Sequence, residues 1–165
     1  MNIEIFSAKG AAKEVKRNPG MWHVISLRGP DQPDSEHPMY KHEQYCAAIV
    51  IRKFDDVWLD KHGQQGYILP SKEDVQACLD FVTEHSPANL LVHCAAGVSR
   101  SSATAYLVAC TMKPASEAIT MLNPMLHMPN ERIVQYGTEI LGNTDIWREF
   151  QKEFGDELFA DLMGY

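Results

Sequence analysis

The sequence lacks the features of several large classes of protein. It has no apolar run that approaches the roughly 18 residues of a membrane-spanning helix, so no membrane span is predicted. The segment Met1 to Phe6 carries neither a basic region nor a long apolar stretch, and no secretory signal is predicted. No His-x-His or Cys-x-x-Cys pair occurs, and the histidines follow no metal-ligand spacing. We therefore expect neither a metal nor another cofactor.

A surplus of positive charge is also lacking. The chain has 15 Lys and Arg against 22 Asp and Glu, for a formal net charge of −7. Nucleic acids and anionic membranes bind basic surfaces, so the composition argues against both as partners. The four cysteines lack the paired spacing of small secreted domains, and Cys46, Cys78 and Cys110 lie in apolar surroundings typical of reduced core residues. A reducing compartment, the cytoplasm, is the expected location.

Length and patterning predict a single α/β domain over residues 1–165. The chain is 45% hydrophobic and 22% charged, as in globular proteins, and shows no internal repeat. Apolar strand patterns alternate with helical patterns, which predicts a central, mostly parallel sheet flanked by helices. The predicted strands are Asn2 to Phe6 at an edge, His23 to Leu27, Cys46 to Ile51 buried on both faces, and Asn89 to His93. The predicted helices are Ala8 to Arg17, Ser71 to His85, Arg100 to Cys110, Ala115 to Leu122, Asn130 to Leu141 and Asp145 to Met163.

Two segments have more than one interpretation. The polar stretch Arg28 to Glu43 contains several prolines and either forms one wall of an active-site cleft or has a disordered tip. The helix Asp145 to Met163 carries an apolar stripe that includes Ile146, Phe150 and Phe154. Such a stripe either covers the sheet or forms the face of a homodimer.

The segment Leu90 to Ser102 contains the strongest functional pattern. It begins as a short apolar strand, continues as a loop from Cys94 to Arg100, and then enters an apolar helix. Loop N–H groups and the positive end of a helix dipole converge in such an arrangement, which makes it an anion site.

The residue types in this loop suit a phosphate ester. Gly97 allows the backbone to approach a ligand, and Arg100 offers a planar fork of donors that fits two phosphate oxygens. Cys94 stands where these groups would stabilise a thiolate, which is a nucleophile aimed at phosphorus. The spacing Cys-x5-Arg alone is a weak signal. The alternative is a buried cysteine in a strand–helix turn, with Arg100 capping a neighbouring element.

The run His-Cys-x-x-Gly-x-Ser-Arg-Ser from His93 to Ser101 resembles the signature of the cysteine-dependent protein tyrosine and dual-specificity phosphatase superfamily. The length resembles its small, dual-specificity-like, prokaryotic-type members. The resemblance implies a metal-independent phosphatase that forms a phosphocysteine on Cys94. It also implies a phosphate-binding loop made by Ala95, Ala96, Gly97, Val98, Ser99 and Arg100.

Such a mechanism needs a general acid that protonates the leaving oxygen. The resemblance places this acid in a loop after an upstream strand, where Asp55, Asp56 and Asp60 are candidates. The run Phe54-Asp55-Asp56 resembles the family's acid loop, in which the second acidic residue is the acid, and this favours Asp56. The alternative is a set of solvated carboxylates on a surface loop.

Three further residues have implied supporting roles. Ser101 resembles the hydroxyl that donates to the cysteine sulfur and helps to expel it from the phosphoenzyme. His93 resembles a buried histidine that orders the loop and does not act as the acid. Asn130, in Met128-Pro129-Asn130, resembles an asparagine whose amide braces the phosphate loop.

The loop composition also bears on the substrate. The positions Ala95, Ala96, Val98 and Ser99 carry no Lys or Arg. Similar enzymes that act on polyphosphorylated inositol lipids usually have extra cations there, so phosphotyrosine in a protein is the predicted substrate. The alternatives are a non-protein phosphoester, a phospho-ligand-binding module without turnover, and sulfur transfer through a cysteine persulfide.

Overall fold

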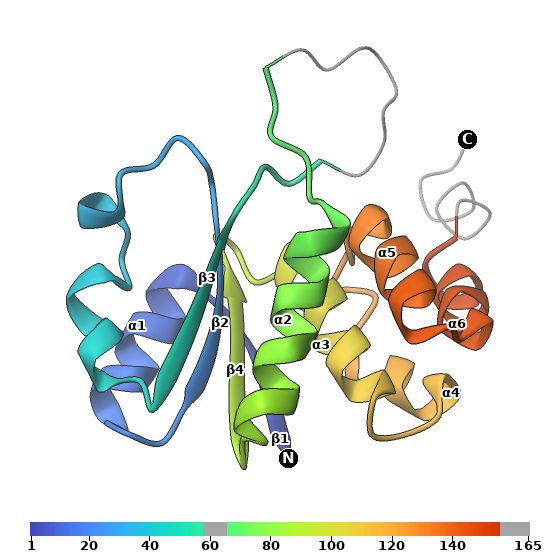
Figure 1. Ribbon diagram of the computed structural model, residues 1–165, viewed down its shortest axis with the longest axis horizontal. Coiled ribbons are helices and arrows are strands. Elements are labelled where there is room, and N and C mark those ends of the chain that lie inside the picture. Colours follow the sequence, from blue (N-terminus) through green and yellow to red (C-terminus); the bar gives the residue numbers. More distant parts are fainter. Residues whose placement is uncertain (58–65, 156–165) are drawn as a thin grey trace.

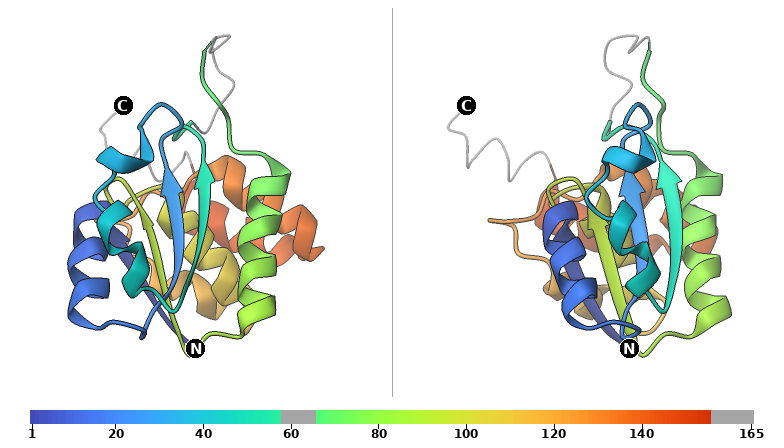
Figure 2. Two further views of the ribbon diagram at one scale, coloured as in Figure 1. Left: turned by 60° about the vertical axis from the view of Figure 1, so that its left-hand side comes forward. Right: turned by 90° about the vertical axis from the view of Figure 1, so that its left-hand side faces the viewer.

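The protein is built around a four-stranded, all-parallel sheet with helices on both faces (Figures 1 and 2). The computed structural model describes residues 1–57 and 66–155. The strand order is β1-β4-β2-β3, so β4 and β2 are central and β1 and β3 form the edges. This architecture confirms the predicted α/β class.

The elements follow the predicted alternation closely. The strands are β1 (Asn2–Ser7), β2 (His23–Arg28), β3 (Ala48–Lys53) and β4 (Asn89–Cys94). The α-helices are α1 (Ala8–Arg17), α2 (Lys72–His85), α3 (Arg100–Cys110), α4 (Ala115–Ala118), α5 (Glu131–Leu141) and α6 (Thr144–Phe154). Three 3-10 helices are η1 (Asp34–Glu36), η2 (Tyr40–Tyr45) and η3 (Ile119–Met121). None of the helices described is long and apolar enough to cross a membrane.

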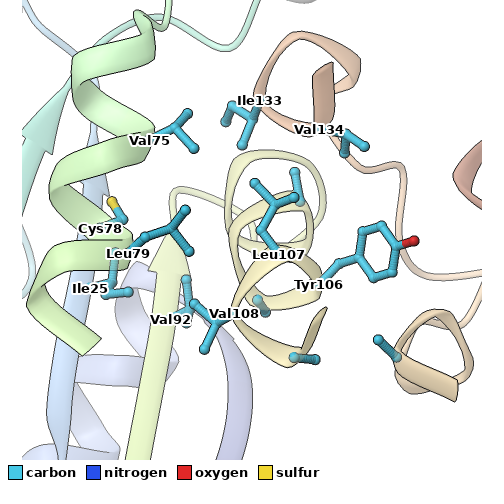
Figure 3. Close-up of a cluster of buried hydrophobic side chains, with 14 of the residues drawn as sticks. Ile25, Val75, Cys78, Leu79, Val92, Tyr106, Leu107, Val108, Ile133 and Val134 are labelled. Carbon is cyan, nitrogen blue, oxygen red and sulfur yellow. The ribbon is translucent and has the colours of Figure 1, made fainter. Parts of the chain in front are cut away.

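The larger core lies between the sheet and α2 and α3 (Figure 3). Val92 of β4 and Leu107 of α3 are fully buried there, and Leu79 of α2 packs against the same cluster. The Tyr106 hydroxyl crosses to the next layer and donates to the Ile146 carbonyl oxygen at 2.9 Å. Helix α3 is therefore buried on nearly every side, as its composition predicts. This packing holds its N-terminus firmly in place.

A smaller core lies on the opposite face, beneath α1 and η2. Trp22 and Met39 are buried there against Val15 of α1 and Leu91 of β4. Both faces of β4 are thus covered, which explains its continuous apolar run.

The prediction for the third strand was wrong in its burial. A doubly buried strand from Cys46 to Ile51 was expected, but β3 begins at Ala48 and lies at an edge, and all of its residues are partly exposed. Within residues 1–57 and 66–155 it pairs with β2 alone, so no described strand covers its other side. Cys46 instead ends η2.

The polar stretch after β2 is packed onto the domain by one buried arginine. Arg28 donates to Asp34 at 3.1 Å and to Glu43 at 2.7 Å, although its own side chain is almost fully buried. Met39, between these two partners, is fully buried. The stretch therefore forms η1 and η2, and η2 packs beside α1 over the smaller core.

The described part of the C-terminal stripe covers this chain's own core. Ile146 and Phe150 are buried in the larger core and Phe154 packs against it. The remainder of the predicted helix, from residue 156, lies outside the described residues. The homodimer hypothesis for this helix stays a prediction.

Candidate active site

The loop between β4 and α3 lies at the carboxyl end of the parallel sheet, where β4 ends at Cys94 and α3 begins at Arg100. Gly97, in the middle of this loop, has a φ of +80°. A Cβ on it would approach the Phe6 carbonyl carbon to 2.8 Å and the Ser7 nitrogen to 2.9 Å. The loop is therefore curled tightly against the β1–α1 junction, which only glycine permits.

Replacing Gly97 by Ala is expected to cost about 2–4 kcal/mol of unfolding free energy, because left-handed strain adds to a clash with backbone that cannot move aside. Gly20→Ala is the matched control. Gly20 has a φ of +74° but nothing within 4 Å of the added Cβ, so it should lose only about 1–2 kcal/mol. Denaturant unfolding of both variants measures the difference, and equal losses would contradict this account of the loop.

Cys94 is held in surroundings that favour its thiolate. Its sulfur lies 3.2 Å from the Ser101 hydroxyl oxygen and accepts a hydrogen bond from the Gly97 N–H at 3.3 Å. Burial would raise the pKa of Cys94. The hydrogen bonds from Ser101 and Gly97 and the charge of Arg100 outweigh this effect, so the pKa is lowered. The expected contact between Ser101 and Cys94 is present.

The guanidinium of Arg100 is buried behind the same loop, with a residue exposure of 6%. Its Nη1 donates to the Phe54 carbonyl oxygen at 2.8 Å, which fixes the plane of the guanidinium group. Its Nε is buried and has no hydrogen-bond partner among residues 1–57 and 66–155. Burying a cationic donor without a partner is costly, and a bound oxyanion would satisfy this one.

Two further segments brace the loop from outside. The Ser102 hydroxyl contacts the carbonyl oxygens of Val98 and Ser99. The N–H groups of Met128 and Asn130 donate to the same two carbonyl oxygens, at 3.1 and 3.2 Å. The carbonyls of Val98 and Ser99 are thus bound by groups outside the loop, which suits a loop whose N–H groups surround an anion. The bracing by Ser102 was not predicted, although a hydroxyl in the first turn of a helix commonly bonds back to such carbonyls.

The three candidate acids have different environments. Asp56 follows β3 and its Oδ1 accepts from the Ser99 hydroxyl at 2.7 Å and from the Asn130 amide at 3.0 Å. Asp55 instead accepts from the Ile68 N–H at 2.8 Å, which holds together the two ends of the intervening loop. Asp60 lies outside the described residues. Of the candidates described, only Asp56 is joined to the loop from Cys94 to Arg100.

Asn130 differs partly from its expected role. Its main-chain N–H braces the loop at Ser99, but its side-chain amide donates to Asp56. Its Oδ1 accepts from the Ile133 N–H at 3.2 Å and so caps α5.

His93 is fully buried, as predicted, and its Nδ1 lies 3.3 Å from the Cys94 carbonyl oxygen. Burial lowers the pKa of His93 to about 3, and it lowers that of the neighbouring His37 to about 4. The ring centroids of this pair are 5.5 Å apart. Both imidazoles are therefore neutral at pH 7, and His93 can order the loop but cannot supply a proton as an imidazolium.

An open cleft of about 250 Å³ adjoins the phosphate loop at Ala95. Lys9, Arg28 and His37 are among the residues that line it. The long stretch after β2 thus does form one wall of a cleft beside the site. Lys9 is exposed and makes no ion pair with any other described residue. Among residues 1–57 and 66–155, no group of three or more side chains could hold a metal ion.

No protein-family model and no curated protein matches this sequence. Solved structures do match it. The human tyrosine phosphatase-like serine/threonine/tyrosine-interacting protein is 15% identical with a TM-score of 0.57, and the match covers 86% of this chain and 91% of that one. DUSP15 is 21% identical with a TM-score of 0.57 and 93% coverage of both chains. PTPMT1 in complex with PI(5)P is 14% identical with a TM-score of 0.54, covering 87% of this chain and 94% of that one. The chain therefore has the fold of the cysteine-dependent tyrosine and dual-specificity phosphatases, as its loop sequence predicts.

Proposed function

We propose that this protein is a phosphomonoester hydrolase that works through a phosphocysteine intermediate. One observation carries the proposal. The sulfur of Cys94, whose pKa is lowered, and the Nε of Arg100, which has no hydrogen-bond partner among the described residues, belong to one loop at the start of a buried helix. A thiolate beside an unsatisfied anion-binding fork is suited to attack on phosphorus.

In the first step, the Cys94 thiolate attacks phosphorus and the bond to the leaving oxygen breaks. Arg100 and the N–H groups of the loop from Ala95 to Ser99 hold the other phosphate oxygens. The leaving oxygen takes the bond's electron pair and a proton from Asp56. This leaves a phosphate group on the sulfur and an ionised Asp56.

In the second step, ionised Asp56 takes a proton from a water molecule, whose oxygen attacks the phosphocysteine. The P–S bond breaks, inorganic phosphate forms and Cys94 departs as a thiolate. The Ser101 hydroxyl, 3.2 Å from the sulfur, stabilises that thiolate. A thiolate enzyme needs a reducing compartment, which is consistent with a cytoplasmic location.

Phosphotyrosine in a protein is the substrate that we favour. Cys94 is only 2% exposed, so the phosphate must reach into the site on a long, narrow leaving group. The loop positions Ala95, Ala96, Val98 and Ser99 supply no cation for a second phosphate. Lys9, in the cleft beside Ala95, favours the alternative, a non-protein phosphoester with a second anionic group.

The test is the hydrolysis of a phosphotyrosine peptide and of an aryl phosphate in the presence of a metal chelator. We expect turnover with both, and competitive inhibition by vanadate, because the site itself binds and stabilises the phosphoryl group. Activity that is lost in chelator and restored by a divalent metal would refute the assignment. Faster turnover of an inositol phospholipid than of the peptide would favour the alternative substrate.

A further inference from the structure

The Asp56 carboxylate is held by two side chains that are remote in sequence. The Ser99 hydroxyl donates to Oδ1 at 2.7 Å across 43 residues, and the Asn130 amide donates to the same oxygen at 3.0 Å across 74 residues. The Asn130 amide also lies 3.4 Å from the Val57 carbonyl oxygen. Asp56 itself is exposed, so these hydrogen bonds, and not burial, are what the structure offers to hold its carboxylate in place.

Both donors are held in place independently of Asp56. Ser99 is 7% exposed, and its carbonyl oxygen is bound by the Ser102 hydroxyl and the Asn130 N–H. Asn130 is fully buried, and its Oδ1 is committed to the Ile133 N–H at the start of α5. Because Oδ1 of Asn130 accepts from the Ile133 N–H, the side-chain NH₂ group on the other arm of the amide is directed at Asp56. The carboxylate thus meets two preoriented donors.

From this arrangement we propose that Ser99 and Asn130 are positioning residues that hold Asp56 over the phosphate loop as the general acid. The proposal rests on the proposed function. Oδ1 already accepts two hydrogen bonds, and the amide donor cannot accept a proton, so the proton given to the leaving group is carried by Oδ2. Ser99 lies next to Arg100, so the loop that binds the phosphate also positions the acid.

The proposal predicts losses that depend on the leaving group. A phenol like that of tyrosine, with a pKa of about 10, needs a proton to leave, whereas a nitrophenol leaves well without one. Asp56→Asn should therefore lower kcat on phosphotyrosine by about 10²–10⁴-fold and on 4-nitrophenyl phosphate much less. Ser99→Ala and Asn130→Ser should show the same selectivity. Each should lower kcat on phosphotyrosine by about 10–100-fold more than on 4-nitrophenyl phosphate, because a small misplacement of the acid is costly.

The variants are chosen to separate positioning from folding. Asn130→Ser retains a side-chain oxygen that can cap α5, but its short side chain cannot reach Asp56. Ser99→Thr retains the hydroxyl that Ser99→Ala removes, and it should keep kcat near the wild-type value. Asp55→Asn keeps an oxygen that can accept from Ile68, and Thr138→Ala removes a hydroxyl that bonds only within α5. Neither of these control substitutions should change the ratio of kcat on phosphotyrosine to kcat on 4-nitrophenyl phosphate.

A double-mutant cycle completes the test. If Ser99 acts through Asp56, then adding Ser99→Ala to Asp56→Asn causes no further selective loss on phosphotyrosine. A selective loss that persists in the Asp56→Asn background, or equal losses on both substrates, overturns the positioning role while the phosphatase assignment stands. A wild-type protein without turnover overturns the proposed function and this inference together.

Discussion

Cys94→Ser is expected to reduce turnover by something on the order of 10⁶-fold, the scale of nucleophile loss in other hydrolases. A serine hydroxyl ionises at a far higher pH than a thiol, and the hydrogen bonds that stabilise the thiolate cannot close that gap. The groups proposed to bind the phosphate are untouched, since Arg100 and the loop N–H groups remain. The variant should therefore still bind a phosphorylated ligand.

Stopped assays with a phosphotyrosine peptide measure the rate, and calorimetric titration with the same peptide measures binding. Cys46→Ser serves as the control. Burial raises the pKa of Cys46 to about 11, so it is a neutral thiol at pH 7 and its replacement should leave turnover intact. Turnover near the wild-type rate in Cys94→Ser would point to another nucleophile.

Arg100→Lys is expected to lower kcat/KM by about 10²–10³-fold and to weaken phosphate binding as well. The guanidinium donates through Nη1 to the Phe54 carbonyl oxygen, and its Nε, which has no hydrogen-bond partner among the described residues, binds the ligand in the proposed mechanism. A lysine has one nitrogen on a flexible stem, so it cannot hold that carbonyl and grip two phosphate oxygens at once. The lysine ammonium would also be buried without the hydrogen-bond partners that a buried charge needs, which is costly.

Arg52→Lys is the matched control for that substitution. Arg52 likewise donates from more than one nitrogen, with Nε at 2.8 Å and Nη2 at 2.6 Å from Asp74 Oδ1. This contact joins β3 to α2 and does not involve the loop that follows β4. It should reduce kcat/KM less than twofold. Inhibition constants for vanadate, measured for both variants, separate the loss of binding from the loss of rate. Equal effects of the two substitutions would show that Arg100 acts through stability alone.

Much of the loop could be predicted from sequence because its chemistry is contiguous. The residues from His93 to Ser101 pass from strand to loop to helix without interruption, and Gly97 lies where the chain must turn. Local backbone geometry then places Cys94, Arg100 and Ser101 around one point, whatever the rest of the domain does. The location of β1 at an edge was also predictable, from its alternating pattern.

What surrounds the loop depended on contacts between distant segments. An apolar run does not reveal how many strands pair with it, so the edge position of β3 could not be read from Ala48 to Lys53. Nor does a polar stretch reveal that Arg28 will pack it against the domain, because its two acidic partners lie on separate turns.

The proposed general acid shows the same division most clearly. The sequence by itself determined a set of three aspartates after a strand, and the family resemblance favoured Asp56. Only the tertiary structure decided that the Ser99 hydroxyl and the Asn130 amide meet on a single oxygen of that residue. The reason is geometric, since hydrogen bonds act over about 3 Å and three segments far apart in the chain come that close only once the sheet and its helices have packed.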